Sequence, residues 1–177
     1  MPTDHFDDIR PFRDAEVRPV VARLVNDQRF ISMVTQVKFP RLHQRLPGPL
    51  RGLFFQLVQR RLKQRLDQLQ SVDDVQRLVY GLMKTAVART TSGLTYSGLE
   101  QLSKGKAYLF LSNHRDIAMD PALVNYALKT SGHDYVEIAI GDNLLSDPLV
   151  ADVMRLNRSF KVNRSVEGMK ARLVAFS

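Results

Sequence analysis

The sequence predicts an α/β protein in which an all-helical N-terminal domain precedes the first part of a mostly parallel α/β domain. Up to Gly93, apolar residues recur at the three- and four-residue spacing of helices. Beyond Gly93, short apolar runs alternate with helical segments, which is typical of a parallel sheet. We therefore expect two domains, at residues 1–93 and 94–177.

Three amphipathic helices are expected before Gly93. The first covers residues 14–25, with Asp14 as its N-cap. Its apolar face would consist of Val17, Val20, Val21, Leu24 and Val25. A connection punctuated by prolines leads to a second helix, over residues 50–69, that is both apolar and basic. A capping box of Ser71 and Asp74 then begins a third helix, which ends near residues 90–93.

Three strands are expected after Gly93, each followed by a helix. The apolar runs at residues 107–111 and 135–140 predict buried strands, and residues 159–162 predict a shorter one. Helical segments are expected near residues 121–130, 147–157 and 165–176. This β-α-β-α-β-α order favours a largely parallel sheet.

Charge is distributed unevenly along the chain, whose net charge is +8. Residues 28–66 contain nine basic side chains and no acidic one. The nine are Arg29, Lys38, Arg41, Arg45, Arg51, Arg60, Arg61, Lys63 and Arg65. This stretch is expected to bind an anionic surface.

Composition excludes several classes of site. The 177 residues include no cysteine, which rules out disulfides and thiol nucleophiles. No apolar run approaches the roughly 20 residues that span a bilayer, and the acidic N-terminus has no apolar signal region. We expect a cytoplasmic protein, peripheral on the inner face of the membrane.

The strongest local signal for chemistry is the loop Ser112 to Pro121, between the first expected strand and the following helix. Ligands of open α/β sheets bind outside the carboxyl ends of the strands. There His114 can take a proton from a hydroxyl, while Asp120 or Asp116 orients its ring. Spacing alone favours a structural role, in which His114 caps a helix or hydrogen-bonds the loop and the two carboxylates serve as N-caps.

His114-Arg115-Asp116 also matches part of a protein-kinase catalytic loop, which needs an Asn five residues after its Asp. That position is Pro121, and no glycine-rich phosphate loop precedes it. The kinase interpretation is therefore rejected.

Asn113-His114 followed by a carboxylate resembles the His-x4-Asp block of the glycerol-3-phosphate and lysophosphatidic acid acyltransferase superfamily. Asp120-Pro121-Ala122 is similar to the continuation in its soluble plastid-type members. Here five residues separate His114 from Asp120, one more than in the family. The Asp-Pro-Ala continuation favours Asp120 over Asp116 as the orienting residue.

The segment from Ile140 to Leu149 also resembles these relatives, as does Met154 to Arg164. By this match Arg164 is implied to bind the acceptor phosphate, with Lys161 a weaker candidate and Arg115 a possible helper. The later Glu-Gly-x-Arg block is missing, since Glu167-Gly168 is followed by Met169-Lys170. The chain is therefore expected to be the first part of a longer or truncated protein.

The resemblance implies transfer of a fatty acyl group from acyl-CoA or acyl carrier protein to a hydroxyl of glycerol phosphate or a lysophospholipid. No metal or bound cofactor is implied. Amides near the start of the 121–130 helix are candidate oxyanion donors. The stretch Arg29 to Arg65 would contact anionic lipid.

Two other functions stay open at this point. The first is a basic helical module that binds nucleic acid, which is disfavoured because the sequence lacks a helix-turn-helix signature and an aromatic-rich strand. The second is a non-catalytic lipid-binding protein, which the missing later block makes credible.

Overall fold

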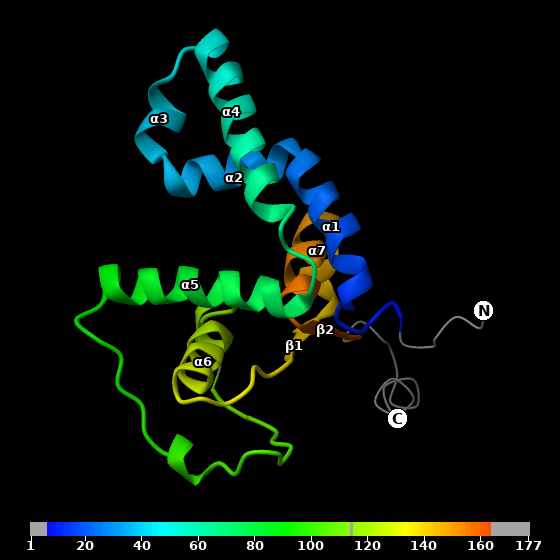
Figure 1. Cartoon of the computed structure of the whole chain (residues 1–177), viewed down its shortest axis with the longest axis vertical. Coiled ribbons are helices and arrows are strands. Elements are labelled where there is room, and N and C mark those ends of the chain that lie inside the picture. The colour runs from blue at the N-terminus through cyan, green and yellow to red at the C-terminus, as the bar shows by residue number, and fades with distance from the viewer. Residues whose placement is uncertain (1–6, 114, 164–177) are drawn as a thin grey trace. The chain divides into compact units, whose positions relative to one another are not determined.

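The structure is a computed structural model that describes residues 7–113 and 115–163. Its α-helices and its strands are labelled in Figure 1. In chain order the elements are α1 (Asp14–Asn26), α2 (Gln28–Lys38), α3 (Pro40–Arg45), α4 (Gly48–Leu66), α5 (Val72–Thr90), η1 (Leu99–Gln101), α6 (Met119–Thr130), β1 (Ile138–Gly141), η2 (Asp142–Leu145), α7 (Pro148–Leu156) and β2 (Ser159–Val162). The order confirms an α/β chain with a helical first region.

The chain divides into two compact units. The first unit combines residues 1–74 with residues 139–177, and the second is Val75–Ile138. This division follows contacts in space and does not coincide with the expected boundary after residue 93, which stays a prediction. Each unit is described by itself below.

The core of the first unit is built around α1, as its apolar spacing predicts. Its buried residues recur every three or four positions: Val17, Val20, Val21, Leu24 and Val25. Ile31 of α2 and Val58 of α4 are buried as well, and both helices pack on α1. Burial of each such side chain stabilises the fold by roughly 1.5–3 kcal/mol.

The helix starts confirm one predicted cap and correct another. Ser71 Oγ accepts the amide of Asp74 at 3.1 Å, and Asp74 accepts the amide of Ser71 at 3.0 Å, as a capping box requires. Asp14 is not the N-cap of α1, because Arg13 occupies that position. The Asp14 carboxylate instead accepts the amide of Val72 at 2.8 Å, in the first turn of α5.

The connection expected between the first two helices is itself helical, which corrects the prediction. Asp27 is the N-cap of α2, and its side chain accepts the amide of Arg29 at 2.7 Å. Ile31 and Thr35, four residues apart, bury one face of this helix. Pro40 lies in the first turn of α3, where the missing amide proton of proline costs nothing.

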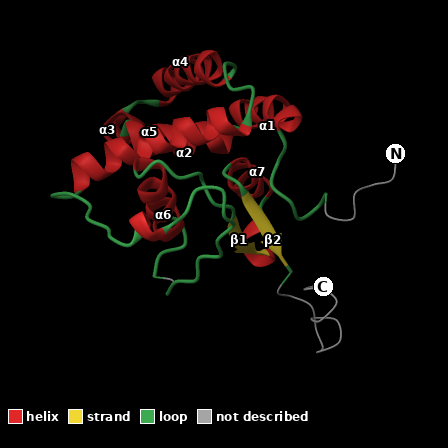
Figure 2. Cartoon of the chain, turned by 60° about the horizontal axis from the view of Figure 1, so that its bottom comes forward, coloured by secondary structure: helices red, strands yellow, loops and turns green. Residues whose placement is uncertain are grey.

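The sheet is smaller than expected, with two neighbouring parallel strands, β1 and β2 (Figure 2). The short strand at residues 159–162 is confirmed, and the strand expected at 135–140 begins only at Ile138. Helices α6 and α7 confirm the segments expected near 121–130 and 147–157. The helix expected at 165–176 lies outside the described residues.

The strand expected at residues 107–111 is wrong. The segment has no regular secondary structure and lies in the long loop before α6 (Figure 2). Leu109 and Leu111 are 84% and 86% exposed. A buried strand needs neighbours for its backbone amides and carbonyls, and the described sheet offers this segment none.

The segment just before α1, residues 7–12, contacts β2 and α7, which the sequence did not predict. The carbonyl of Ile9 accepts the amide of Lys161 at 2.7 Å. The Arg155 guanidinium donates to the carbonyls of Arg10 and Asp7, at 2.9 and 2.8 Å. It also lies 4.3 Å from the ring centroid of Phe12. The first described residues are therefore part of the same unit as α7 and β2.

The second unit is organised by one buried amide on α6. Asn125 accepts the amide of Val136 at 2.8 Å through Oδ1 and donates to the carbonyl of the same residue at 3.4 Å through Nδ2. Tyr80 of α5 stacks on Tyr126 of α6, with ring centroids 5.3 Å apart. These contacts hold α6, whose N-terminus carries the candidate site.

Among the residues that the structure describes, no helix is long and apolar enough to cross a membrane.

Candidate functional site

The candidate site is the loop that enters α6, and two carboxylates organise its backbone. Asp116 lies three residues before the helix, and its Oδ1 accepts the amides of Ala118 and Met119 at 2.9 and 2.8 Å. These are two of the amides that the first turn of a helix leaves without partners. The Asp116 side chain therefore caps the N-terminus of α6.

Asp120 turns back from the first turn of α6 onto the loop. Its Oδ2 accepts the amide of Arg115 at 2.6 Å and that of Asp116 at 2.9 Å. The amide nitrogen of Arg115 belongs to the peptide bond that joins it to His114. The half-buried Asp120 carboxylate thus holds the backbone directly after the predicted catalytic residue.

The two carboxylates have different hydrogen-bond partners, although the sequence offers both as the residue that orients His114. Asp116 is exposed and faces the helix start, whereas Asp120 faces the loop around Arg115. His114 itself lies outside the described residues. Which carboxylate orients its ring stays a prediction.

The setting of this loop differs from the predicted one. We expected a crevice at the carboxyl end of a buried strand, but the preceding residues 107–111 are exposed and form no strand. Arg115 is exposed beside the loop. The site is therefore defined by the start of α6 and not by the two-stranded sheet.

The amides proposed as oxyanion donors already have acceptors. Those of Ala118 and Met119 donate to Asp116 Oδ1, and those of Asp120 and Ala122 donate to carbonyls one turn earlier, each at 3.3 Å. An oxyanion at this helix start would have to displace one of them. The described first turn of α6 offers no preorganised pair of donors.

Of the predicted phosphate-binding residues, Lys161 and Arg164 lie on either side of residue 163, where the described range ends. Arg164 lies outside the described residues. Lys161 is on β2 in the first unit, and its ammonium is 3.1 Å from Oδ2 of Asp8. Sequence reasoning did not find Asp8 as its partner, because only the fold brings residues so distant in the chain together.

Ion pairs of the first unit also shift the pKa of acidic side chains. The guanidinium of Arg29, which pairs with the Asp147 N-cap of α7, lowers the pKa of that carboxyl. Hydrogen bonds from Arg10 and from the Arg13 amide lower the pKa of Glu16. These groups lie away from the α6 loop in sequence.

The described residues contain no group of three or more His, Asp or Glu side chains placed to hold a metal ion.

Comparison with protein families gives the decisive observation. Residues 93–176 match the family model described as Acyltransferase. The chain carries an acyltransferase domain. The match is consistent with the glycerol-3-phosphate and lysophosphatidic acid acyltransferase superfamily, as the resemblance around His114 implied. Comparison with curated proteins and with solved structures gave no significant match.

The acyltransferase segment includes every predicted site residue. His114, Arg115, Asp116 and Asp120 lie in the first half of the matched range, and Lys161 and Arg164 lie near its end. A general acyltransferase function is therefore supported for the chain. The match does not assign roles to individual residues.

Proposed function

We propose that this acyltransferase moves a fatty acyl group from an acyl thioester to a hydroxyl of a glycerol phosphate or a lysophospholipid. The acyl donor would be acyl-CoA or the acyl thioester of acyl carrier protein. The product would enter phospholipid synthesis on the inner face of the membrane. The observation that supports the proposal most is the Asp120 carboxylate, which binds the amides of Arg115 and Asp116 beside His114.

The proposed reaction is an O-acyl transfer with one proton in transit. His114 takes the proton of the acceptor hydroxyl while its oxygen attacks the thioester carbonyl. The carbon–sulfur bond breaks, and the thiolate leaves with its electron pair. The imidazolium then gives up its proton to the thiolate or to water. No step requires a bound cofactor or metal.

Asp120 is proposed as a positioning residue in this reaction. A carboxylate that fixes the loop backbone also fixes the direction in which the neighbouring side chain leaves it. An anionic partner further stabilises an imidazolium as it forms. Asp116 would contribute by keeping the start of α6 intact.

The acceptor phosphate is proposed to bind Arg164, helped by Lys161 and Arg115. A guanidinium can bind phosphate through two parallel hydrogen bonds, and an ammonium acts as a point charge. Lys161 would have to exchange its contact with Asp8, 67% of whose side chain is exposed, for the phosphate. Exposed ion pairs of this kind are worth at most about 1 kcal/mol, so the exchange costs little.

A labelled-acyl assay tests this proposal. Acyl-CoA and the acyl thioester of acyl carrier protein serve as donors, and glycerol-3-phosphate, lysophosphatidic acid and unphosphorylated glycerol as acceptors. The proposal predicts transfer to a phosphorylated acceptor and at least about tenfold less to glycerol, because the charge-assisted phosphate contacts are missing. Equal transfer to glycerol would contradict the phosphate site.

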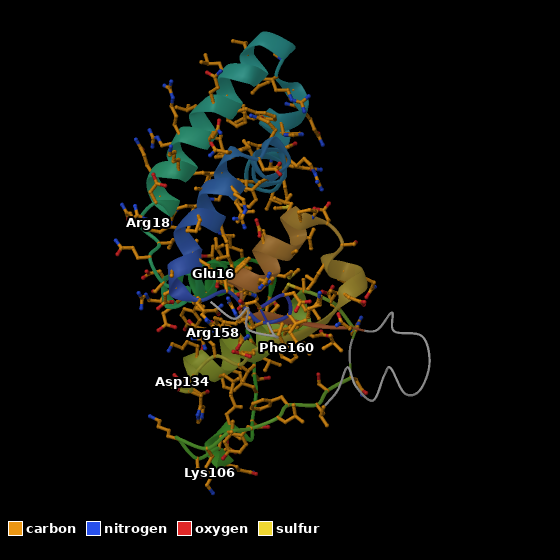
Figure 3. All side chains as sticks on the ribbon, turned by 90° about the vertical axis from the view of Figure 1, so that its right-hand side faces the viewer. Glu16, Arg18, Lys106, Asp134, Arg158 and Phe160 are labelled. Carbon is orange, nitrogen blue, oxygen red and sulfur yellow. The ribbon has the colours of Figure 1, made fainter. Side chains whose placement is uncertain are left out.

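Arg164→Ala examines the same site with a matched control. We expect a higher KM for the phosphorylated acceptor with a smaller change in kcat, since the lost contact exists in both ground and transition states. The control is Arg18→Ala, which removes the same charge from the exposed face of α1 (Figure 3). An equal rise in KM in both variants would mean that Arg164 acts only through net charge.

A further inference from the structure

Helix α4 presents apolar side chains on two faces, and only one of these faces packs on other residues that the structure describes. Val58 and Leu66 are buried on the inner face. Leu50, Leu53 and Leu57 follow one another at helical spacing on the other face, and they are 54%, 66% and 53% exposed. We call these three residues the outer leucine stripe. It is about 10 Å long at the 1.5 Å rise of a helix.

Basic side chains extend the outer leucine stripe along the same helix. Arg60 and Arg61 lie one turn beyond Leu57 on the same face, and both are exposed. Arg51, Lys63 and Arg65 of α4 are exposed as well. No acidic residue occurs between Gln28 and Leu66. Figure 3 shows nitrogen-tipped side chains projecting from the ribbon of this helix.

We infer that the outer leucine stripe inserts into the surface of an anionic membrane, with Arg60 and Arg61 on the lipid headgroups. A helix with a leucine face beside a cationic one lies in the interface, its apolar side chains below the headgroups. Long basic side chains reach outward from such a helix to phosphate oxygens. The inference names the residues through which the chain contacts the membrane. It rests on the proposed function in one respect, namely that an enzyme acting in phospholipid synthesis has to reach a lipid surface.

Charge argues against a second copy of the chain on this surface, and the exposed leucines argue against a nucleic acid. A second copy of the chain would bring Arg60 and Arg61 close to other cations, which repel them. A nucleic acid would satisfy the arginines but would gain nothing from Leu50, Leu53 and Leu57. An anionic membrane satisfies both kinds of side chain at once.

Insertion of the leucines and binding by charge alone differ in how the membrane affinity should depend on salt. Salt at 1 M shortens the screening length to about 3 Å and weakens contacts between exposed charges. Burial of leucines in lipid persists under these conditions, because salt does not weaken the hydrophobic effect. Part of the membrane affinity should therefore remain in high salt and depend on the outer leucine stripe.

Vesicle binding of the whole chain tests the inference. The probes are phosphatidylglycerol–phosphatidylcholine vesicles at 0.1 and 1 M salt, with pure phosphatidylcholine for comparison. Leu53→Ser combined with Leu57→Ser should weaken binding to the anionic vesicles about tenfold or more and abolish the part that resists salt. Arg60→Gln with Arg61→Gln should remove mainly the salt-sensitive part.

Two matched controls keep these results specific. Leu82→Ser changes another half-exposed leucine, 54% exposed on α5, and should leave binding unchanged. Arg18→Gln removes an exposed charge from α1 and should have less effect than the variant with Arg60→Gln and Arg61→Gln. An equal loss in the stripe variant and in Leu82→Ser would overturn the inference, as would tighter binding of DNA than of anionic vesicles at matched salt. Dimerisation that the stripe variant abolishes would also overturn it.

A fluorescence measurement detects insertion directly. The chain contains no tryptophan, so Leu53→Trp places a single probe on the stripe. Lipids brominated on their acyl chains should quench this probe and should not quench the corresponding Leu82→Trp. Equal quenching of the two probes, or none, would exclude insertion at α4.

Transfer to glycerol-3-phosphate without vesicles separates this inference from the proposed function. The acceptor is soluble in water, so the stripe variant should retain this activity. A wild-type chain that transfers acyl groups but does not bind anionic vesicles overturns the membrane inference alone. A chain that inserts into vesicles but transfers no acyl group overturns the proposed function alone.

Discussion

The carboxylate of Asp120 accepts the backbone amide of Arg115 at 2.6 Å, across the loop that begins α6. The same oxygen accepts the amide of Asp116 at 2.9 Å. A side chain four or five residues later in the sequence thus fixes the backbone beside His114. The extra residue between His114 and Asp120, relative to the family pattern, is compatible with this arrangement.

The first prediction concerns this carboxylate. Asp120→Asn keeps the size of the side chain but removes the charge that would stabilise an imidazolium. We expect kcat to fall at least about tenfold, while the melting temperature changes little. Asp116→Asn is the matched control, because asparagine also caps helices, and it should retain most activity. The reverse pattern, with Asp116→Asn the more damaging, would make Asp116 the orienting residue.

The second prediction separates helix capping from catalysis. Asp116→Ala removes the acceptor of the Ala118 and Met119 amides, so it should lower the free energy of unfolding by about 0.5–2 kcal/mol. Urea denaturation measures the loss. Asp116→Asn should restore most of the stability. If the alanine variant unfolded at the same urea concentration as the wild type, Asp116 would not support the helix.

The third prediction concerns pH. The Arg10 guanidinium lies 2.7 Å from Glu16, and this hydrogen bond, together with the Arg13 amide, lowers the pKa of Glu16 below its usual range. A depressed pKa adds stability above the unfolded value of about 4.3, and that stability is lost as the pH falls through the folded value. Glu16→Gln should therefore destabilise the chain at pH 7 and have a smaller effect at pH 3.

Thermal melting over this pH range measures the effect, with Glu137→Gln as the control at an exposed position. A Glu16→Gln deficit that stayed constant from pH 7 to pH 3 would show that the charge of Glu16 contributes nothing. An equal deficit in both variants would assign the effect to net charge.

The fourth prediction concerns the exposed pair of Lys161 and Asp8, 3.1 Å apart. If Lys161 helps to bind the acceptor phosphate, Asp8 competes with that phosphate for its ammonium. Asp8→Asn should then lower the KM for glycerol-3-phosphate up to several-fold, since exposed pairs contribute at most about 1 kcal/mol. Asp67→Asn, at the end of α4, is the control. An unchanged KM in Asp8→Asn would remove Lys161 from the phosphate site.

Local signals in the sequence predicted much of the fold correctly. The valines of α1 and the Ser71–Asp74 capping box identify their helices because both signals involve residues three or four positions apart. The short strand at residues 159–162 and the helices α6 and α7 were found in the same way. The family resemblance, which rests on a short block around His114, also agrees with the family match.

Long-range contacts account for what the sequence could not predict. An apolar run such as residues 107–111 becomes a strand only if neighbouring strands accept its hydrogen bonds, and hydropathy does not reveal such neighbours. Asp14 resembles an N-cap of its own helix, but it binds the amide of Val72. The contact of Arg155 with Phe12 likewise joins positions far apart in the chain.

Part of the candidate site could likewise be predicted from the sequence, and part could not. The loop and its carboxylates follow from the order of His114, Asp116 and Asp120 along the chain. The amides that each carboxylate accepts differ, and only the structure shows which amides these are. Asp8 gave no signal in the sequence, because only the fold brings it to Lys161.

The most direct test of the central claim is labelled acyl transfer to glycerol-3-phosphate by the wild-type chain and by His114→Ala. Circular dichroism establishes that both are folded, and His5→Ala is the matched control. We expect kcat/KM to fall at least about 10²-fold in His114→Ala and to be unchanged in His5→Ala. Undiminished transfer by His114→Ala, or no transfer by a folded wild-type chain with either donor, would contradict the account.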